Sequence, residues 1–206
     1  GDSIYDNISL IPKLAKDGLV KCRIEVKNTS GKTLHQVELS PNNIDTFIFD
    51  GKASNGKVLD EGSYYATLTA EYNNGYLSSA PSPSFVIDLT PPKASVRASD
   101  KIFSPDGDGK LDSVTFFQGA SEDSWHANIF AISKGGKRIG LPLVTIEFAN
   151  LPPKKIVWTG LDKNGNLLED GRYGYVLEGI DEAGNKAESN MEIVSLNTEK
   201  ANLILQ

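Results

Sequence analysis

The residues best suited to chemistry are three aspartates in the segment FSPDGDGKLDSV, which begins at Phe103. Asp106, Asp108 and Asp112 occupy positions one, three and seven of a loop that also contains two glycines. Three carboxylates this close together repel one another unless a cation or water separates them, and such hard oxygen donors favour Ca²⁺. The spacing therefore makes these three aspartates candidate calcium ligands.

The loop differs from an EF-hand, and a turn without metal accounts for the same residues. Position five is Lys110, and Phe117 stands at position twelve, where an EF-hand has a glutamate. Backbone carbonyls and waters would have to complete a seven-coordinate site. In the alternative, the aspartates accept hydrogen bonds from backbone N–H groups, while Gly107 and Gly109 supply unusual dihedral angles. The sequence is compatible with both interpretations.

Little else in the sequence indicates catalysis. The two histidines, His35 and His126, belong to no recognisable nucleophile, metal or acid–base motif. His126 alternates with Trp125 and Ala127, which predicts a polar histidine on the outer face of a strand. No glycine-rich phosphate loop leads into a helix. We therefore expect a protein that is not an enzyme.

The single cysteine, Cys22, excludes an intramolecular disulfide. It lies in VKCRIEVK, where Val20, Cys22, Ile24 and Val26 alternate with charged residues. This period of two predicts a strand with Cys22 on its buried face, where a thiol packs as a small apolar group.

Composition limits the partners. The 206 residues include 21 Lys and Arg against 27 Asp and Glu, which gives a formal charge of −6. Affinity for nucleic acid and anionic lipid depends on basic residues, and those of this chain are scattered, so neither partner is expected. No stretch approaches the ~20 apolar residues of a membrane span, so we expect no membrane insertion. Ten prolines and nineteen glycines between short apolar runs favour β structure.

An internal repeat sets the domain organisation. The segment FDGKASNGKVLDEGSYYATLTA, from Phe49, recurs without gaps as WTGLDKNGNLLEDGRYGYVLEG, from Trp158, at an offset of 109 residues (158 − 49). A gapless repeat of this length indicates duplication of a whole folding unit. We therefore predict an all-β fold of two tandem immunoglobulin-like β-sandwich domains with about seven strands each.

The predicted boundaries follow from the repeat and from the prolines between its copies. The first domain covers residues 1–89, a Pro-rich linker covers 90–93, the second domain covers 94–197, and residues 198–206 start a further repeat or form an extended tail. Consecutive prolines favour an extended, stiff linker. The strands expected in the second domain lie near residues 94–98, 113–118, 125–132, 143–148, 155–159, 171–180 and 186–194.

Both ends of the chain also match internal segments. GDSIYDN, from Gly1, aligns with GDGKLDS, from Gly107, and KANLIL, from Lys200, echoes KASVRA, from Lys93. We interpret the chain as a piece of a longer repeat array whose first unit has lost its opening strand. A complete two-domain protein with frayed termini is the alternative.

Comparison of the copies also explains several polar and aromatic residues. Each copy keeps an Asn-Gly pair, which predicts a tight turn and removes the need for a metal at Asp162. Asp181 is interpreted in the same way. Tyr64 and Tyr173 follow a glycine at the start of the longest strand, which predicts a tyrosine corner, with an exposed aromatic platform as the alternative.

The segment WTGLDKNGNLLEDGRYGY, with IDEAGN downstream, resembles the FlgD-like immunoglobulin-type domains of bacterial envelope and secreted proteins. FSPDGDGKLD is similar to the FSPNGDG segment that opens such domains and related gliding-motility-associated modules. The resemblance covers residues 96–194 and, less closely, 2–86. It implies an extracytoplasmic bacterial protein and carries no catalytic residues.

Together these features predict a structural spacer or adhesive stalk of a cell-envelope or surface protein. Its expected partners are neighbouring repeats and an unidentified protein or glycan ligand. The alternatives are an accessory module of a secreted enzyme and a scaffold for flagellar or secretion assembly.

Overall fold

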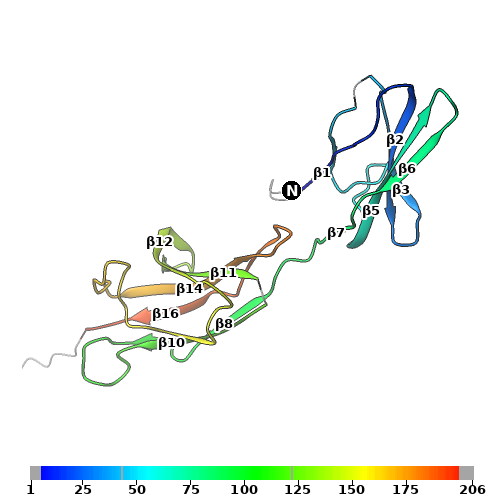
Figure 1. Ribbon diagram of the computed structural model, residues 1–206. Coiled ribbons are helices and arrows are strands. Elements are labelled where there is room, and N and C mark those ends of the chain that lie inside the picture. Colours follow the sequence, from blue (N-terminus) through cyan, green and yellow to red (C-terminus); the bar gives the residue numbers. More distant parts are fainter. Residues whose placement is uncertain (1–5, 43, 122, 200–206) are drawn as a thin grey trace, which may run out of the picture. The chain divides into compact units, whose positions relative to one another are not determined.

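The computed structural model describes residues 6–42, 44–121 and 123–199 (Figure 1). The chain divides into two compact units, Gly1–Thr90 (unit 1) and Pro91–Gln206 (unit 2). The described residues form strands, turns and loops, with no helix among them. The prediction of an all-β fold with tandem immunoglobulin-like sandwiches is confirmed.

Unit 1 has seven strands in its described part, arranged in two sheets. They are β1 (Ile8–Leu10), β2 (Leu19–Asn28), β3 (Thr33–Leu39), β4 (Phe47–Phe49), β5 (Gly62–Tyr72), β6 (Leu77–Pro81) and β7 (Phe85–Ile87). One sheet pairs β1 with β4, and the other has the order β3-β2-β5-β6, with β7 also paired to β5. Val26, Phe49, Leu59 and Tyr64 form its main buried cluster.

Unit 2 has nine strands in its described part. They are β8 (Ala94–Ala98), β9 (Ile102–Phe103), β10 (Val114–Ala120), β11 (Ser124–Ile132), β12 (Arg138–Glu147), β13 (Lys155–Trp158), β14 (Gly171–Ile180), β15 (Lys186–Glu188) and β16 (Glu192–Leu196). The first sheet has the order β13-β10-β8, and the second β12-β11-β14-β16-β9, with β15 also paired to β14. The core between them is rich in large rings, including Phe116, Trp125, Trp158 and Tyr175.

Two local predictions were wrong in detail. The strand expected at 186–194 is interrupted, because the Ser189 hydroxyl accepts a hydrogen bond from the Leu177 N–H and donates one to the Asn190 carbonyl. Val20, expected on the buried face of β2, is 54% exposed. The pairing of β2 with β5 shifts register between Leu19 and Lys21, so the alternation holds only from Cys22 onwards.

The two units share a strand register as well as the repeated sequence motif. Ile8 pairs with Phe49 in unit 1, and Val114 pairs with Trp158 in unit 2. The Asn-Gly turns match too, because Gly56 and Gly165 have φ angles of 81° and 82°. Only glycine adopts such angles without steric cost, which explains why both copies contain it.

The predicted tyrosine corner is present in both units. The Tyr64 hydroxyl donates to the Asp60 carbonyl at 2.7 Å, and the Tyr173 hydroxyl donates to the Glu169 carbonyl at 2.6 Å. Both side chains are buried. These tyrosines therefore pack the sandwich edge, and the alternative of an exposed platform does not hold.

Candidate metal site

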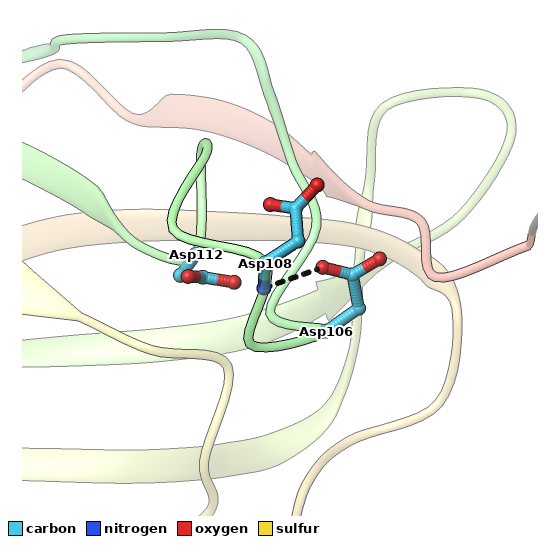
Figure 2. Close-up of side chains that lie close together, drawn as sticks. All are labelled: Asp106, Asp108 and Asp112. Carbon is cyan, nitrogen blue, oxygen red and sulfur yellow. Dashed lines mark hydrogen bonds between the residues drawn. The ribbon is translucent and has the colours of Figure 1, made fainter.

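The Asp-rich loop connects β9 to β10 in unit 2 and brings all three predicted ligands together. One carboxylate oxygen from each of Asp106, Asp108 and Asp112 lies within 4.8 Å of the other two (Figure 2). Asp106 and Asp108 are exposed, whereas Asp112 is half-buried. Local sequence spacing was sufficient to predict this group, because all three residues belong to one short loop.

Backbone N–H groups bind these carboxylates. Asp112 accepts hydrogen bonds from the N–H groups of Gly107 and Gly109, each at 2.8 Å and each to a different oxygen. Asp106 accepts from the Asp108 N–H at 3.2 Å (Figure 2), and Asp108 accepts from the Lys110 N–H at 2.8 Å. The contacts foreseen for a turn without metal are therefore present.

The loop backbone is held in an unusual conformation. Leu111 has a φ of 54°, the only positive φ of a non-glycine residue in the described chain. A left-handed conformation costs a residue with a Cβ roughly 1–2 kcal/mol. The Ser104 N–H donates to the Leu111 carbonyl at 2.8 Å, which closes the loop around this residue. The aspartates are thus fixed by the backbone before any ligand is considered.

The hydrogen bonds leave capacity for a cation. A carboxylate offers about four lone-pair sites, so an oxygen that accepts one N–H can still face a metal ion. Within the described residues, the second oxygen of Asp108 accepts no hydrogen bond. This all-oxygen donor set suits a hard cation such as Ca²⁺, with water completing the coordination.

Calcium addition and removal separate the two interpretations of the loop. If Ca²⁺ binds with a Kd on the order of 10⁻⁴ M, ~1 mM Ca²⁺ stabilises unit 2 by about 1.4 kcal/mol through linkage. We expect the melting temperature of the parent chain to rise with Ca²⁺ and fall again with chelator, and Asp108→Ala to remove this response. Both tryptophans, Trp125 and Trp158, lie in unit 2, so their fluorescence reports its melting directly.

Asp162→Ala is the matched control, because this aspartate also lies in a glycine turn and is expected to leave the calcium response intact. A parent melt that is indifferent to Ca²⁺ would contradict metal binding and leave the turn interpretation in its place.

The Asp162 side chain organises its own turn. Its Oδ1 accepts hydrogen bonds from the backbone N–H groups of Asn166 and Asn164, at 2.9 and 2.8 Å. These hydrogen bonds, above all the one from the Asn166 N–H, hold the pKa of Asp162 below its ordinary value. Asp181 accepts from the Asn185 N–H in the same manner, at 2.8 Å. Turn geometry accounts for both aspartates.

The two histidines belong to different units and have different surroundings. His35 Nδ1 lies 2.8 Å from the Lys52 carbonyl oxygen, and its ring stacks on Phe47 at a centroid distance of 5.6 Å. His126, on the outer face of β11, has its Nε2 3.3 Å from a Glu178 carboxylate oxygen. Neither arrangement forms a nucleophile–base pair.

A charged network beside His126 was not foreseen. Arg138 contacts both Glu178 and Glu188, and Glu178 also accepts from the Asn128 amide at 3.0 Å. A groove of about 650 Å³ lies next to it, over one end of β11, β14 and β15. The partners lie 40 to 50 residues apart in the sequence, so no local sequence signal could have indicated the network. The single positive charge of Arg138 offsets only part of the charge of the two glutamates.

No protein-family model matches the sequence, and no curated protein matches it. Among solved structures, a tetra-tandem repeat from the extending region of a large adhesion protein is 16% identical, over 96% of this chain and 47% of its own, with a TM-score of 0.37. This chain thus spans about half the length of that structure. A 1.5-MDa bacterial ice-binding adhesin is 16% identical over 88% of this chain and 55% of its own, with a TM-score of 0.47. The Clostridium thermocellum CbhA fibronectin(III)-like modules are 15% identical over 98% and 90%, with a TM-score of 0.40.

Because these identities and TM-scores are low, the class of the protein is taken from its own strand pairing. That pairing defines a tandem immunoglobulin-like β-sandwich protein. Within the described residues, no helix is long and apolar enough to cross a membrane.

Proposed function

We propose that this chain is a non-enzymatic tandem-repeat segment of a bacterial cell-envelope or surface protein, where it acts as a structural spacer or adhesive stalk. The observation that carries the proposal is what the two units share. Equivalent positions hold turn glycines, corner tyrosines and paired core residues, such as Ile8–Phe49 and Val114–Trp158. Duplication has kept the elements that build a sandwich, as expected of a repeated spacer unit.

The proposed location is extracytoplasmic. It rests on the resemblance of the WTGLDKNGN and FSPDGDG segments to FlgD-like domains of bacterial envelope and secreted proteins. The proposed partners are neighbouring repeats of the same protein and an unidentified protein or glycan ligand. The candidate calcium loop fits this setting, because extracellular modules bind Ca²⁺ with Kd values on the order of 10⁻⁴–10⁻³ M.

Surface labelling of the encoding cells tests the proposal. Antibodies raised against the chain are expected to label intact cells, and external protease is expected to abolish the label. Labelling only after permeabilisation would contradict a surface location.

Two observations test the alternatives. A hydrolase domain encoded in the same polypeptide would support an accessory module of a secreted enzyme. Co-purification of the chain with hook or export components would support an assembly scaffold.

A further inference from the structure

The last strand in the described part of each unit ends at an equivalent position. In unit 1, β7 ends at Ile87, which pairs with Gly62 at the start of β5. In unit 2, β16 ends at Leu196, which pairs with Gly171 at the start of β14. Both steps equal the repeat offset, because 196 − 87 and 171 − 62 are each 109. The chain therefore leaves the two sandwiches at the same place, close to the tyrosine corner.

In unit 1, a carboxylate at this corner binds the departing chain. Glu61 directly precedes the paired glycine. Its Oε1 accepts hydrogen bonds from the Leu89 N–H at 2.8 Å and from the Thr90 hydroxyl at 2.6 Å. The Thr90 N–H donates to Asp88 Oδ1 at 3.0 Å. Side chains thus bind two successive backbone N–H groups beyond the end of β7.

Unit 2 has the same arrangement. Asp170 directly precedes its paired glycine. The Thr198 N–H donates to its Oδ1 and Oδ2, at 2.9 and 3.0 Å, and the Thr198 hydroxyl donates to Oδ1 at 2.8 Å. The Glu199 N–H donates to Asn197 Oδ1 at 2.9 Å. Again a carboxylate and an adjacent polar side chain bind two successive N–H groups beyond the last strand.

The two units make equivalent contacts with different residues. The repeat offset relates Glu61 to Asp170 (170 − 61 = 109). It also relates Leu89 to Thr198 (198 − 89 = 109), so the bound N–H group is the same in both units. The hydroxyl that completes the contact comes from one residue later in unit 1, Thr90. Duplication has therefore kept the contact while the side chains that make it have changed.

Prolines do not account for the contact. Pro91 and Pro92 follow the bound residues of unit 1, and consecutive prolines favour an extended chain by themselves. The corresponding positions after unit 2 are Lys200 and Ala201, and the carboxylate contact before them is present all the same. The carboxylate, and not the proline pair, is what the two exits share.

Each carboxylate is attached to a fixed part of its unit. The residue directly before it accepts, with its carbonyl oxygen, the hydrogen bond of the corner tyrosine: Asp60 from Tyr64, and Glu169 from Tyr173. The rings of both tyrosines are buried. Hydrogen bonds to an ionised acceptor are also stronger than those between neutral groups. A continuous set of contacts thus joins the core, the corner and the departing backbone.

We propose that Glu61 and Asp170 are clasps that order the chain as it leaves each unit. The tyrosine fixes the corner to the core, and the carboxylate fixes the departing backbone to the corner. The first residues after the last strand are then ordered by the unit that they leave, whether or not prolines follow. This conformational device goes beyond the proposed spacer role and rests on the contacts of the chain itself, so it does not depend on the cellular location.

Amide hydrogen exchange of the full chain, measured by NMR, tests the clasps, and each unit is the control for the other. Glu61→Ala is expected to speed exchange of the Leu89 N–H about tenfold, as for loss of a hydrogen bond to a charged group, and to leave the Thr198 N–H unchanged. Asp170→Ala is expected to do the reverse. Unchanged exchange of the amides in β2 and β14 separates loss of a clasp from unfolding of a unit. Unaltered exchange of Leu89 in Glu61→Ala, or faster exchange at both exits in either variant, would overturn the proposal.

Backbone mobility distinguishes a clasp from a simple change of charge. The heteronuclear NOE of the Leu89 and Thr90 backbone nitrogens is expected to fall in Glu61→Ala, because the departing chain gains motion on the ps–ns timescale. Thr90→Val removes the hydroxyl but keeps the branched shape, and is expected to lower the NOE at residue 90. Thr90→Ser keeps the hydroxyl and is expected to match the parent. Equal NOE values in the parent and all the variants would show that the exit is ordered without the carboxylate, contrary to the proposal.

Discussion

Gly179→Ala is expected to lower the free energy of unfolding of unit 2 by about 2–3 kcal/mol, in the range of overpacking substitutions. A Cβ at this position would lie 2.3 Å from Cε3 of Trp125. The indole cannot easily move away, because it is 3% exposed and its Nε1 donates to the Ser121 carbonyl at 3.1 Å. Urea denaturation followed by tryptophan fluorescence measures the effect within unit 2.

Gly119→Ala provides the matched control on β10. The nearest atom to a Cβ there is the Ser95 hydroxyl oxygen at 3.8 Å, an ordinary contact. Neither glycine has a positive φ, so backbone strain does not separate them. Gly119→Ala is expected to change stability by less than about 1 kcal/mol. Equal losses from the two substitutions would show that the clash with the indole is not the cause.

Unit 1 suggests how the clash can be relieved, because it pairs Cys22 with Ala70 at the equivalent ladder position. In a Trp125→Cys background, Gly179→Ala should cost much less than in the parent, although Trp125→Cys is itself destabilising. A double-mutant cycle over Trp125 and Gly179 measures this coupling. Trp158 remains as the fluorescent probe.

Tyr175→Ala is expected to destabilise unit 2 by about 3–5 kcal/mol, the range for removing a buried aromatic ring. The ring is fully buried and stacks on Phe116 at a centroid distance of 4.1 Å. Its hydroxyl donates to Gln118 Oε1 at 2.5 Å, and the Gln118 amide donates to the Pro153 carbonyl. Tyr175→Phe keeps the ring but leaves Gln118 without its donor, and is expected to cost about 1–3 kcal/mol.

The Tyr175 hydroxyl also introduces a pH dependence. Burial raises the pKa of Tyr175 well above its ordinary value of 10.0. The unfolded chain loses this proton near pH 10, whereas the folded chain keeps it. Its stabilising contribution is therefore complete below about pH 10 and declines above it. The stability difference between the parent and Tyr175→Phe, measured by denaturation, should shrink as pH rises past 10. A constant difference would contradict an alkaline titration of this group.

Local patterns predicted the fold well, and long-range contacts were the main omission. The constant repeat offset predicted the turns at Gly56 and Gly165, and one short loop fixed the positions of the three candidate ligands. The fit between Trp125 and Gly179 was not foreseen, since 54 residues separate them (179 − 125) and glycine carries no sign of what packs against it. The exposure of Val20 depends on a register shift, which residue alternation cannot reveal.

The only thiol of the chain provides a kinetic reporter of unit 1. Cys22 is fully buried on β2, and burial raises its pKa, so a thiol reagent reaches it only after local or global opening. The labelling rate therefore times the opening of unit 1, while tryptophan emission follows unit 2 in the same sample.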